Sequence, residues 1–280
     1  MSYTTLITAE QLRTLGNDAV LIDTSFDLAD TEAGECSYRE AHIPAAHYLH
    51  LDRDLSGAKT GHNGRHPLPR REDFARLMGS LGLTPARQAV VYDRHGAMFA
   101  ARAWWLLRWL GHRAVAVLDG GLPAWVAAGG AVSSETVPRR EGAAPYPASP
   151  TAAMPTVDAD TLLRRLGRVR LLDARAGERF RGEVEPLDKQ AGHIPGAALR
   201  FFKDNLQADG RFKPAEQLRA EFAALIAGTA PDSVVQQCGS GATACHNLLA
   251  MEHAGLGTSL LYPGSWSEWS SDPSRPVAIG

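Results

Sequence analysis

The sequence predicts two tandem α/β domains, each with a mainly parallel sheet flanked by helices. Short apolar runs alternate with longer helical patterns, which favours parallel strands joined by right-handed crossovers. Four landmarks also recur in the same order at a nearly constant spacing, which indicates a repeated domain. The length of 280 residues fits two domains of ordinary size.

Each landmark of the first half has a counterpart 144 to 151 residues later in the chain. The pairs are Asp23 and Asp173, His42 and His193, Asp93 and Cys238, and Trp125 and Trp269. Between the two copies, the segment 136–155 contains five prolines and little apolar periodicity, as expected of a semi-extended linker. We therefore predict an N-terminal domain over 1–137, a linker over 138–155 and a C-terminal domain over 156–280.

The apolar runs predict buried strands, and the helical patterns predict the crossover helices. Strands are expected at 19–22, 89–92, 114–118, 169–172, 233–236 and 259–262. Helices are expected at 71–81, 97–110, 214–226 and 243–254, with Gly111, Gly228 and Gly255 near helix ends. Ligands of parallel sheets collect at the carboxyl ends of the strands, and Cys238 stands at such an end.

The composition excludes several classes of protein. Basic residues number 29 and acidic residues 31, whereas nucleic-acid binders usually carry a large basic excess. No window approaches the roughly 18 uninterrupted apolar residues of a membrane span. The first fifteen residues lack the basic and apolar regions of a secretory signal, and three cysteines do not make a disulfide framework. We expect a cytoplasmic protein that binds neither nucleic acid nor a membrane.

Cys238 begins a tight loop between a predicted strand and a predicted helix. The loop comprises Gly239, Ser240, Gly241, Ala242, Thr243 and Ala244. Its glycines permit unusual backbone angles, so that successive amide groups can turn inward and form an anion nest. The nest and the positive end of the following helix both favour the thiolate, which is the attacking form of cysteine. The pattern therefore predicts a nucleophilic Cys238.

Other interpretations of this cysteine fit the sequence less well. A buried structural cysteine is common, but the glycines around Cys238 argue against it. A phosphatase loop needs arginine where Ala244 stands, and a Walker loop needs Gly-Lys-Ser/Thr. Zinc ligands could be drawn from Cys238, Cys245, His246 and His253, but no Cys-x-x-Cys pair is present. We expect no metal and no cofactor.

The combined motifs resemble those of two-domain rhodanese-type sulfurtransferases, which act on thiosulfate or 3-mercaptopyruvate. The motifs are the Cys238 loop, His-Ile-Pro in both halves, the segment 119–125 and the segment 264–269. In that family the first domain lacks the loop cysteine, which matches Asp93 at the equivalent position. The resemblance implies tandem rhodanese-like domains, a Cys238 persulfide, an anionic sulfur donor, and cyanide, a thiol or a thioredoxin-like protein as acceptor.

The resemblance also implies roles for individual residues. Arg179 matches an arginine that binds the donor anion, and Arg175 is a second candidate. A further arginine of the 3-mercaptopyruvate branch is replaced by Leu187, which leaves the preferred donor open. A Ser-His-Asp relay matches Ser240 and His42, with Asp30 as the nearest aspartate.

Two further candidates for substrate binding complete the predicted site. His66 lies in a polar, proline-braced segment that is a further candidate for substrate binding, together with the backbone of the Cys238 loop. We expect a monomer. The alternative function is a persulfide carrier or redox-regulatory binding protein that turns over small donors slowly.

Overall fold

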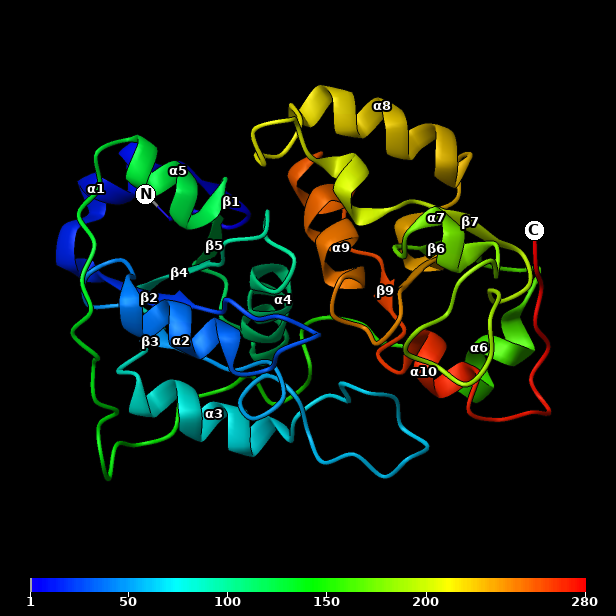
Figure 1. Cartoon of the computed structure of the whole chain (residues 1–280), viewed down its shortest axis with the longest axis horizontal. Helices are drawn as coiled ribbons and strands as arrows, with labels where there is room; N and C mark the ends of the chain where they lie inside the picture. The colour runs from blue at the N-terminus through cyan, green and yellow to red at the C-terminus, as the bar shows by residue number, and fades with distance from the viewer. Residues whose placement is uncertain (1) are drawn as a thin grey trace. The chain divides into compact units, whose positions relative to one another are not determined.

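The computed structural model describes residues 2–280, which form two compact units (Figure 1). The first unit comprises the chain up to Gly57, with Pro69–Ala153 and Ala208–Phe212. The second comprises Ala58–Leu68, Met154–Gln207 and Lys213–Gly280. Each unit therefore includes a short segment from the other half of the sequence. The segment 58–68 matters most, because it contains His66.

The first unit contains a five-stranded parallel sheet in the order β1-β5-β4-β2-β3. Its strands are β1 (Leu6–Ile7), β2 (Ala19–Asp23), β3 (His47–Tyr48), β4 (Gln88–Tyr92) and β5 (Val115–Leu118). Its helices are α1 (Ala9–Leu15), α2 (Ala33–Glu40), α3 (Arg71–Ser80), α4 (Ala100–Leu110) and α5 (Gly121–Ala127), with a 3-10 turn over Gly16–Asp18. Leu12 of α1 and Trp125 of α5 pack on Val90, Tyr92 and Leu118 to form the core.

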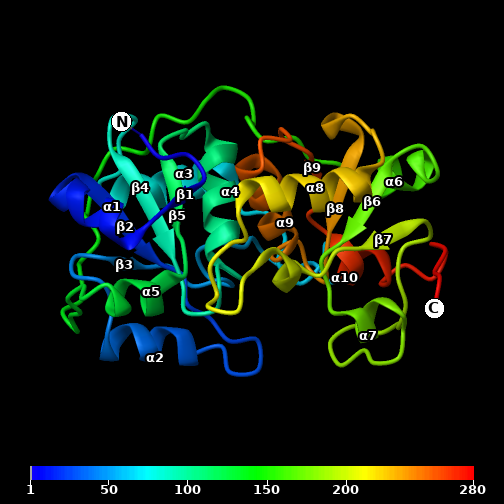
Figure 2. The same ribbon diagram turned by 90° about the horizontal axis from the view of Figure 1, so that it is seen from above.

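The second unit contains a four-stranded parallel sheet in the order β7-β6-β8-β9. Its strands are β6 (Arg170–Asp173), β7 (Ala197–Leu199), β8 (Val234–Gln237) and β9 (Leu260–Leu261). Its helices are α6 (Ala159–Arg165), α7 (Gly177–Phe180), α8 (Ala215–Ile226), α9 (Ala244–His253) and α10 (Ser265–Trp269), with 3-10 turns at Phe202–Asn205 and Pro231–Ser233. Figure 2 shows the strands of each unit side by side among these helices.

These observations confirm the predicted fold class. The strongly periodic elements lie within about three residues of the expected positions: β8 spans 234–237 where 233–236 was expected, and α4 begins at Ala100 rather than at residue 97. The structure adds short elements such as β1, β3 and α7. These are two to four residues long, too short for a hydrophobic period to indicate them.

The register of the second sheet determines where the chemistry lies. Asp173, the last residue of β6, is paired with Gln237, the last residue of β8. The amide of Ala174 then donates to the carbonyl of Gln237 at 2.9 Å. The segments that follow the two strands, one containing Cys238 and the other Arg175, therefore leave the same sheet edge together.

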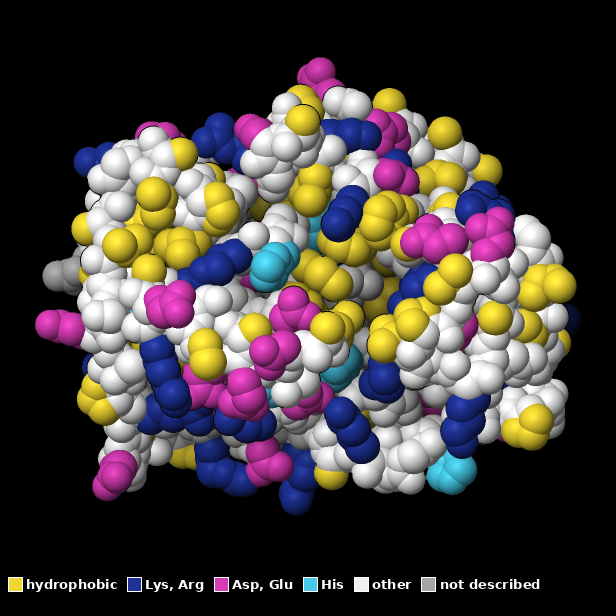
Figure 3. Space-filling view, viewed as in Figure 1, with side chains coloured by type: hydrophobic (Ala, Val, Ile, Leu, Met, Phe, Trp, Pro, Cys, Tyr) yellow, Lys and Arg dark blue, Asp and Glu magenta, His cyan; other side chains and the backbone are white. Residues whose placement is uncertain are grey.

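Basic and acidic side chains are interspersed over the face drawn in Figure 3. Within residues 2–280, no helix is long and apolar enough to cross a membrane. The same residues contain no group of three or more His, Cys, Asp or Glu side chains placed to hold a metal ion.

Candidate active site

Cys238 lies directly after β8 and is 1% exposed. Its Sγ accepts hydrogen bonds from the amides of Ser240 at 3.4 Å and Gly241 at 3.1 Å. The amide of Cys238 itself donates to Ser265 Oγ at 3.1 Å. The loop therefore directs two backbone N–H dipoles at the sulfur, an arrangement that stabilises negative charge.

Glycine is required at position 241 for this loop to close. Its φ is +79°, which side chains rarely adopt, and a Cβ atom there would lie 2.3 Å from the carbonyl oxygen of Pro263. The loop then enters α9, because the carbonyls of Ala242 and Thr243 accept the amides of Cys245 and His246 at 3.1 Å. Ala242 and Ala244 are buried, so the loop packs against the core as well as around the sulfur.

Asp93 occupies the equivalent position of the first unit, directly after β4. One carboxylate oxygen accepts the amides of His95 and Ala97, and the other accepts those of Phe99 and Ala100, at 2.8 to 3.0 Å. The loop after the central strand thus surrounds a carboxyl group with four backbone amides in the first unit. This comparison within one chain indicates that the backbone geometry suits an anion.

Ser240 has a histidine partner in the second unit. Its Oγ lies 2.6 Å from Nδ1 of His66, and both side chains are buried. His66 is positioned by its neighbours, because the amide of Arg65 donates to Ser267 Oγ at 3.0 Å. The neighbouring Gly64 lies so close to the carbonyl of Gly264 that a Cβ atom there would be 2.7 Å from it.

His42 and Asp30, the other two predicted members of the relay, lie in the first unit. The ring nitrogens of His42 lie 2.6 Å from the carbonyl of Tyr38 and 3.0 Å from that of Glu135, and the ring stacks on Tyr38. His193 is the counterpart of His42 in the second unit; its Nδ1 lies 2.8 Å from the carbonyl of Phe180, on which the ring stacks. Both imidazoles therefore brace a turn.

Asp30 has a local role of the same kind. Its carboxylate is exposed and accepts the amide of Glu32 at 3.1 Å. The structure thus brings Ser240 together with His66. His42 and Asp30 instead form hydrogen bonds with backbone groups of the first unit.

Two guanidinium groups lie beside Gly239, the residue that follows Cys238. A Cβ atom on Gly239 would lie 3.0 Å from Nη2 of Arg65 and 3.3 Å from Nη1 of Arg179. Both arginines also form ion pairs with Asp188, whose side chain is 5% exposed. Arg179 was predicted for this position, whereas Arg65 was not. Its only signal in the sequence is its place directly before His66.

Glu185 holds Arg179 and the turn that carries Asp188. Its carboxylate accepts from Arg179 at 2.6 Å, and from the amides of Leu187 and Asp188 at 3.1 and 3.2 Å. Leu187, at the position where the resemblance implies an arginine, is 43% exposed. With Arg65, Leu187 and Asp188 line a cavity of about 230 Å³.

Arg175 lies inside the fold. Its guanidinium donates to Asp173 at 2.8 Å and to the carbonyl of Gly192 at 2.7 Å, and it stacks over the Trp266 ring at 4.7 Å. Its side chain is 1% exposed. These contacts join β6, the second His-Ile-Pro turn and α10, and they leave the guanidinium surrounded by protein groups.

A family model described as "Rhodanese-like domain" matches the chain twice, over residues 8–128 and 158–272. The chain is 50% identical to a Pseudomonas aeruginosa protein named "Probable 3-mercaptopyruvate sulfurtransferase", over the full length of both chains. It is 34% identical to a thiosulfate sulfurtransferase of Cricetulus griseus, covering 97% of this chain and 93% of the relative.

A solved structure agrees with these comparisons. SseA from Escherichia coli, described as a 3-mercaptopyruvate sulfotransferase, matches with a TM-score of 0.79 and 29% identity, over 95% of this chain and all of the other. The family model matches each half of the chain, and the Pseudomonas aeruginosa relative aligns over its whole length. The chain therefore belongs to the rhodanese family of two-domain sulfurtransferases.

Proposed function

We propose that this chain transfers sulfane sulfur from thiosulfate or 3-mercaptopyruvate through a persulfide on Cys238. The observation that carries the proposal is a thiol held by two loop amides, with two guanidinium groups beside the adjacent glycine. The amides stabilise negative sulfur, and the guanidinium groups attract an anionic donor. Sulfur transfer is thus supported by the proposed nucleophile, by the cations beside it and by the names of the relatives.

In the first half-reaction, the Cys238 thiolate attacks the outer sulfur of the donor and forms an S–S bond. With thiosulfate, the S–S bond of the donor breaks and its electron pair leaves on sulfite. With 3-mercaptopyruvate, the C–S bond breaks and the pair leaves on carbon, which takes up a proton to give pyruvate. In the second half-reaction, an acceptor nucleophile takes the outer sulfur and the Cys238 thiolate is regenerated.

Ser240 and His66 are proposed to supply the proton that 3-mercaptopyruvate requires. The Oγ to Nδ1 distance of 2.6 Å is short enough for proton movement between the two groups. Ser240 lies two residues after Cys238, and its amide contacts Sγ. Sulfite leaves as a stable anion and needs no such proton. The pair therefore favours 3-mercaptopyruvate as the donor, as does the name of the 50% identical relative.

Arg65 and Arg179 are proposed to bind the donor anion together, and Arg65 takes the part of the arginine that Leu187 replaces. Its guanidinium approaches Gly239 as closely as that of Arg179 does. Asp188 pairs with both arginines, so an incoming carboxylate or sulfonate competes with Asp188 for their N–H groups. Arg175 is proposed to stabilise the fold, because Asp173 and Gly192 already occupy its N–H groups.

The acceptor is proposed to be a thiophilic anion, a small thiol or a reduced thioredoxin-like protein. Each of these can attack the outer sulfur of a persulfide without a metal or cofactor. We also propose that the protein acts as a monomer in the cytoplasm.

The test is steady-state turnover of both donors with cyanide, combined with mass spectrometry of the protein after exposure to donor alone. We expect one added sulfur on Cys238 and loss of turnover to background in Cys238→Ser. Cys36→Ser is the matched control, because Cys36 is exposed on α2 of the first unit. Turnover that survives in Cys238→Ser would overturn the proposal. A persulfide without turnover on either donor would favour the carrier function.

A further inference from the structure

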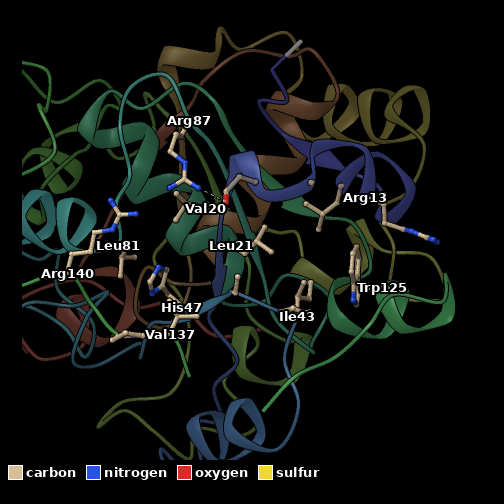
Figure 4. Close-up of a pocket in the computed structure, with 16 residues that line it drawn as sticks. Arg13, Val20, Leu21, Ile43, His47, Leu81, Arg87, Trp125, Val137 and Arg140 are labelled. Atoms are coloured by element: carbon tan, nitrogen blue, oxygen red, sulfur yellow. Dashed lines mark hydrogen bonds between the residues drawn. The ribbon is translucent and has the colours of Figure 1, made fainter. Parts of the chain in front are cut away.

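The first unit contains a cavity of about 460 Å³ that the sulfur-transfer chemistry does not use (Figure 4). It lies beside the first half of β2, where the edge of the sheet is incomplete. The short strand β3 pairs with β2 only at Ile22 and Asp23. Val137 and Pro138, from the segment that follows α5, form part of the wall. The volume falls within the range of about 300 to 1,000 Å³ typical of small-molecule sites.

The polar lining of this cavity is basic. Its sixteen lining residues include Arg13, Arg87, Arg140 and His47, but no aspartate or glutamate. Burial, with Arg139 and Arg140 nearby, lowers the pKa of His47, so the imidazole is neutral at pH 7. The positive charge of the lining therefore comes from arginine.

The basic and apolar groups are separated along the cavity. In Figure 4, Arg87, Arg140 and His47 lie around Leu81 at one end, whereas Ile43 and Trp125 lie toward the other. The side chain of Arg13 extends beyond Trp125 and away from the centre of the cavity. The arrangement is a basic end joined to an apolar wall.

Arg140 is the cation best placed to meet a ligand. Arg87 is held by backbone groups, because it donates to the carbonyls of Ala19 and Gly82 at 3.1 and 3.2 Å. The guanidinium of Arg140 lies over Gly82, where a Cβ atom would be 2.7 Å from its central carbon. Within residues 2–280 no carboxylate forms an ion pair with Arg140, whereas the adjacent Arg139 pairs with Asp54 at 2.9 Å.

We propose that this cavity binds a soluble amphipathic carboxylate, with its head at Arg140 and Arg87 and its apolar body along Leu21 and Ile43 toward Trp125. The charge of the lining matches an anionic head, and the opposite wall matches a hydrocarbon or aromatic body. This site is separate from Cys238, and it gives the non-catalytic unit a binding function of its own.

The test is isothermal titration of the full chain with decanoate below its micelle concentration, with decanol as the neutral probe of the same length. We expect saturable decanoate binding, weaker binding of decanol, and roughly tenfold weaker decanoate binding in Arg140→Gln, equivalent to about 1.4 kcal/mol. Arg139→Gln is the matched control and should bind decanoate like the parent chain. Leu21→Trp should fill the cavity and abolish binding.

Three outcomes of the titration would overturn the proposal. They are the absence of saturable decanoate binding, equal loss in Arg139→Gln and Arg140→Gln, and full binding in a folded Leu21→Trp variant. Binding to anionic phospholipid vesicles without binding of free decanoate would also overturn it, because the surface would then recognise a bilayer. Since none of these variants touches Cys238, sulfur transfer is measured separately and its failure is distinguishable.

Discussion

Asp93 and Cys238 follow the central strands of their respective sheets, and backbone amides of the next loop donate to the side chain of each. The carboxylate of Asp93 receives four amides, and the sulfur of Cys238 receives two. The repeated fold thus supplies the same anion nest twice. In the first unit the side chain of Asp93 occupies it, at the position where the second unit has Cys238.

Replacing Asp93 by Asn is expected to destabilise the first unit. The asparagine side chain has one oxygen in place of two. The backbone amides of one pair, either His95 and Ala97 or Phe99 and Ala100, therefore lose their acceptor in a fully buried site. The expected loss is roughly 2 kcal/mol in the free energy of unfolding, measured by urea denaturation. Asp73→Asn is the control, because Asp73 lies on the solvent side of α3.

An Asp93→Asn variant as stable as the parent chain would contradict this prediction. It would mean that the loop amides are satisfied equally well without the second oxygen.

Replacing His66 by Gln is expected to separate the two donors. With 3-mercaptopyruvate, kcat/KM should fall by about 100-fold, because the leaving carbon loses its proton supply. With thiosulfate, kcat/KM should change by a few-fold at most, because sulfite leaves without a proton. Ser240→Ala should show the same difference between donors, and its effect should not add to that of His66→Gln.

His42→Gln is the matched control for this experiment. Because His42 contacts the carbonyls of Tyr38 and Glu135, its loss should lower stability and leave the ratio of the two donors unchanged. If His42→Gln changed that ratio while His66→Gln did not, His42 would be the relay histidine and the assignment of His66 would be wrong.

Replacing Arg65 by Ala is expected to raise KM for both anionic donors by roughly tenfold, with a smaller effect on kcat. A charge-assisted hydrogen bond to the donor is lost, and such bonds contribute about 1.5 kcal/mol. Adding Leu187→Arg should recover part of the lost affinity, because a cation returns to the turn beside Asp188. Arg181→Ala is the control, since Arg181 is exposed and pairs with Glu183.

If Arg65→Ala left KM unchanged, Arg179 alone would bind the donor. If Leu187→Arg raised the affinity for the donor equally in the presence and absence of Arg65, the two cations would act independently. The proposal that Arg65 takes the part of the arginine missing at position 187 would then be wrong.

The fold and the place of the Cys238 loop directly after a strand could be predicted from the sequence because their signals are local or repeated. The alternation of short apolar runs with helical patterns indicates the sheets, and the glycines around Cys238 indicate a tight loop after a strand. The anion nest itself follows from a backbone geometry that glycine at position 241 permits. Elements such as β3, with two residues, carry no period and could not be predicted.

The partners of Cys238 were harder to predict because they depend on tertiary contacts. His66 and Ser240 are 174 positions apart, and the segment 58–68 has no periodicity that would indicate its association with the second unit. The family resemblance pointed instead to His42, whose counterpart His193 has the same stacked, carbonyl-bonded environment. The equivalent contacts of His42 and His193 in the two copies indicate a structural role for both. The residues proposed for catalysis differ between the two copies.

The hydrogen bonds of Glu221 on α8 predict that the stability of the second unit depends on pH. Burial by itself would raise the pKa of Glu221, but hydrogen bonds from Arg200, Lys213 and Gln217 outweigh it and lower the pKa to about 2. Because the pKa is lower in the folded chain than in the unfolded chain, the ionised carboxylate stabilises the fold above about pH 4.5. That contribution decreases as pH falls from about 4.5 toward 2.

Glu221→Gln is therefore expected to lower the free energy of unfolding at pH 7 by roughly 1 to 2 kcal/mol, a value reduced for partial solvent exposure. The difference from the parent chain should shrink between pH 4.5 and pH 2, as measured by urea denaturation at several pH values. Glu216→Gln, an exposed site on the same helix, should show no such dependence. A difference that stayed constant down to pH 2 would mean that Glu221 contributes through packing rather than charge.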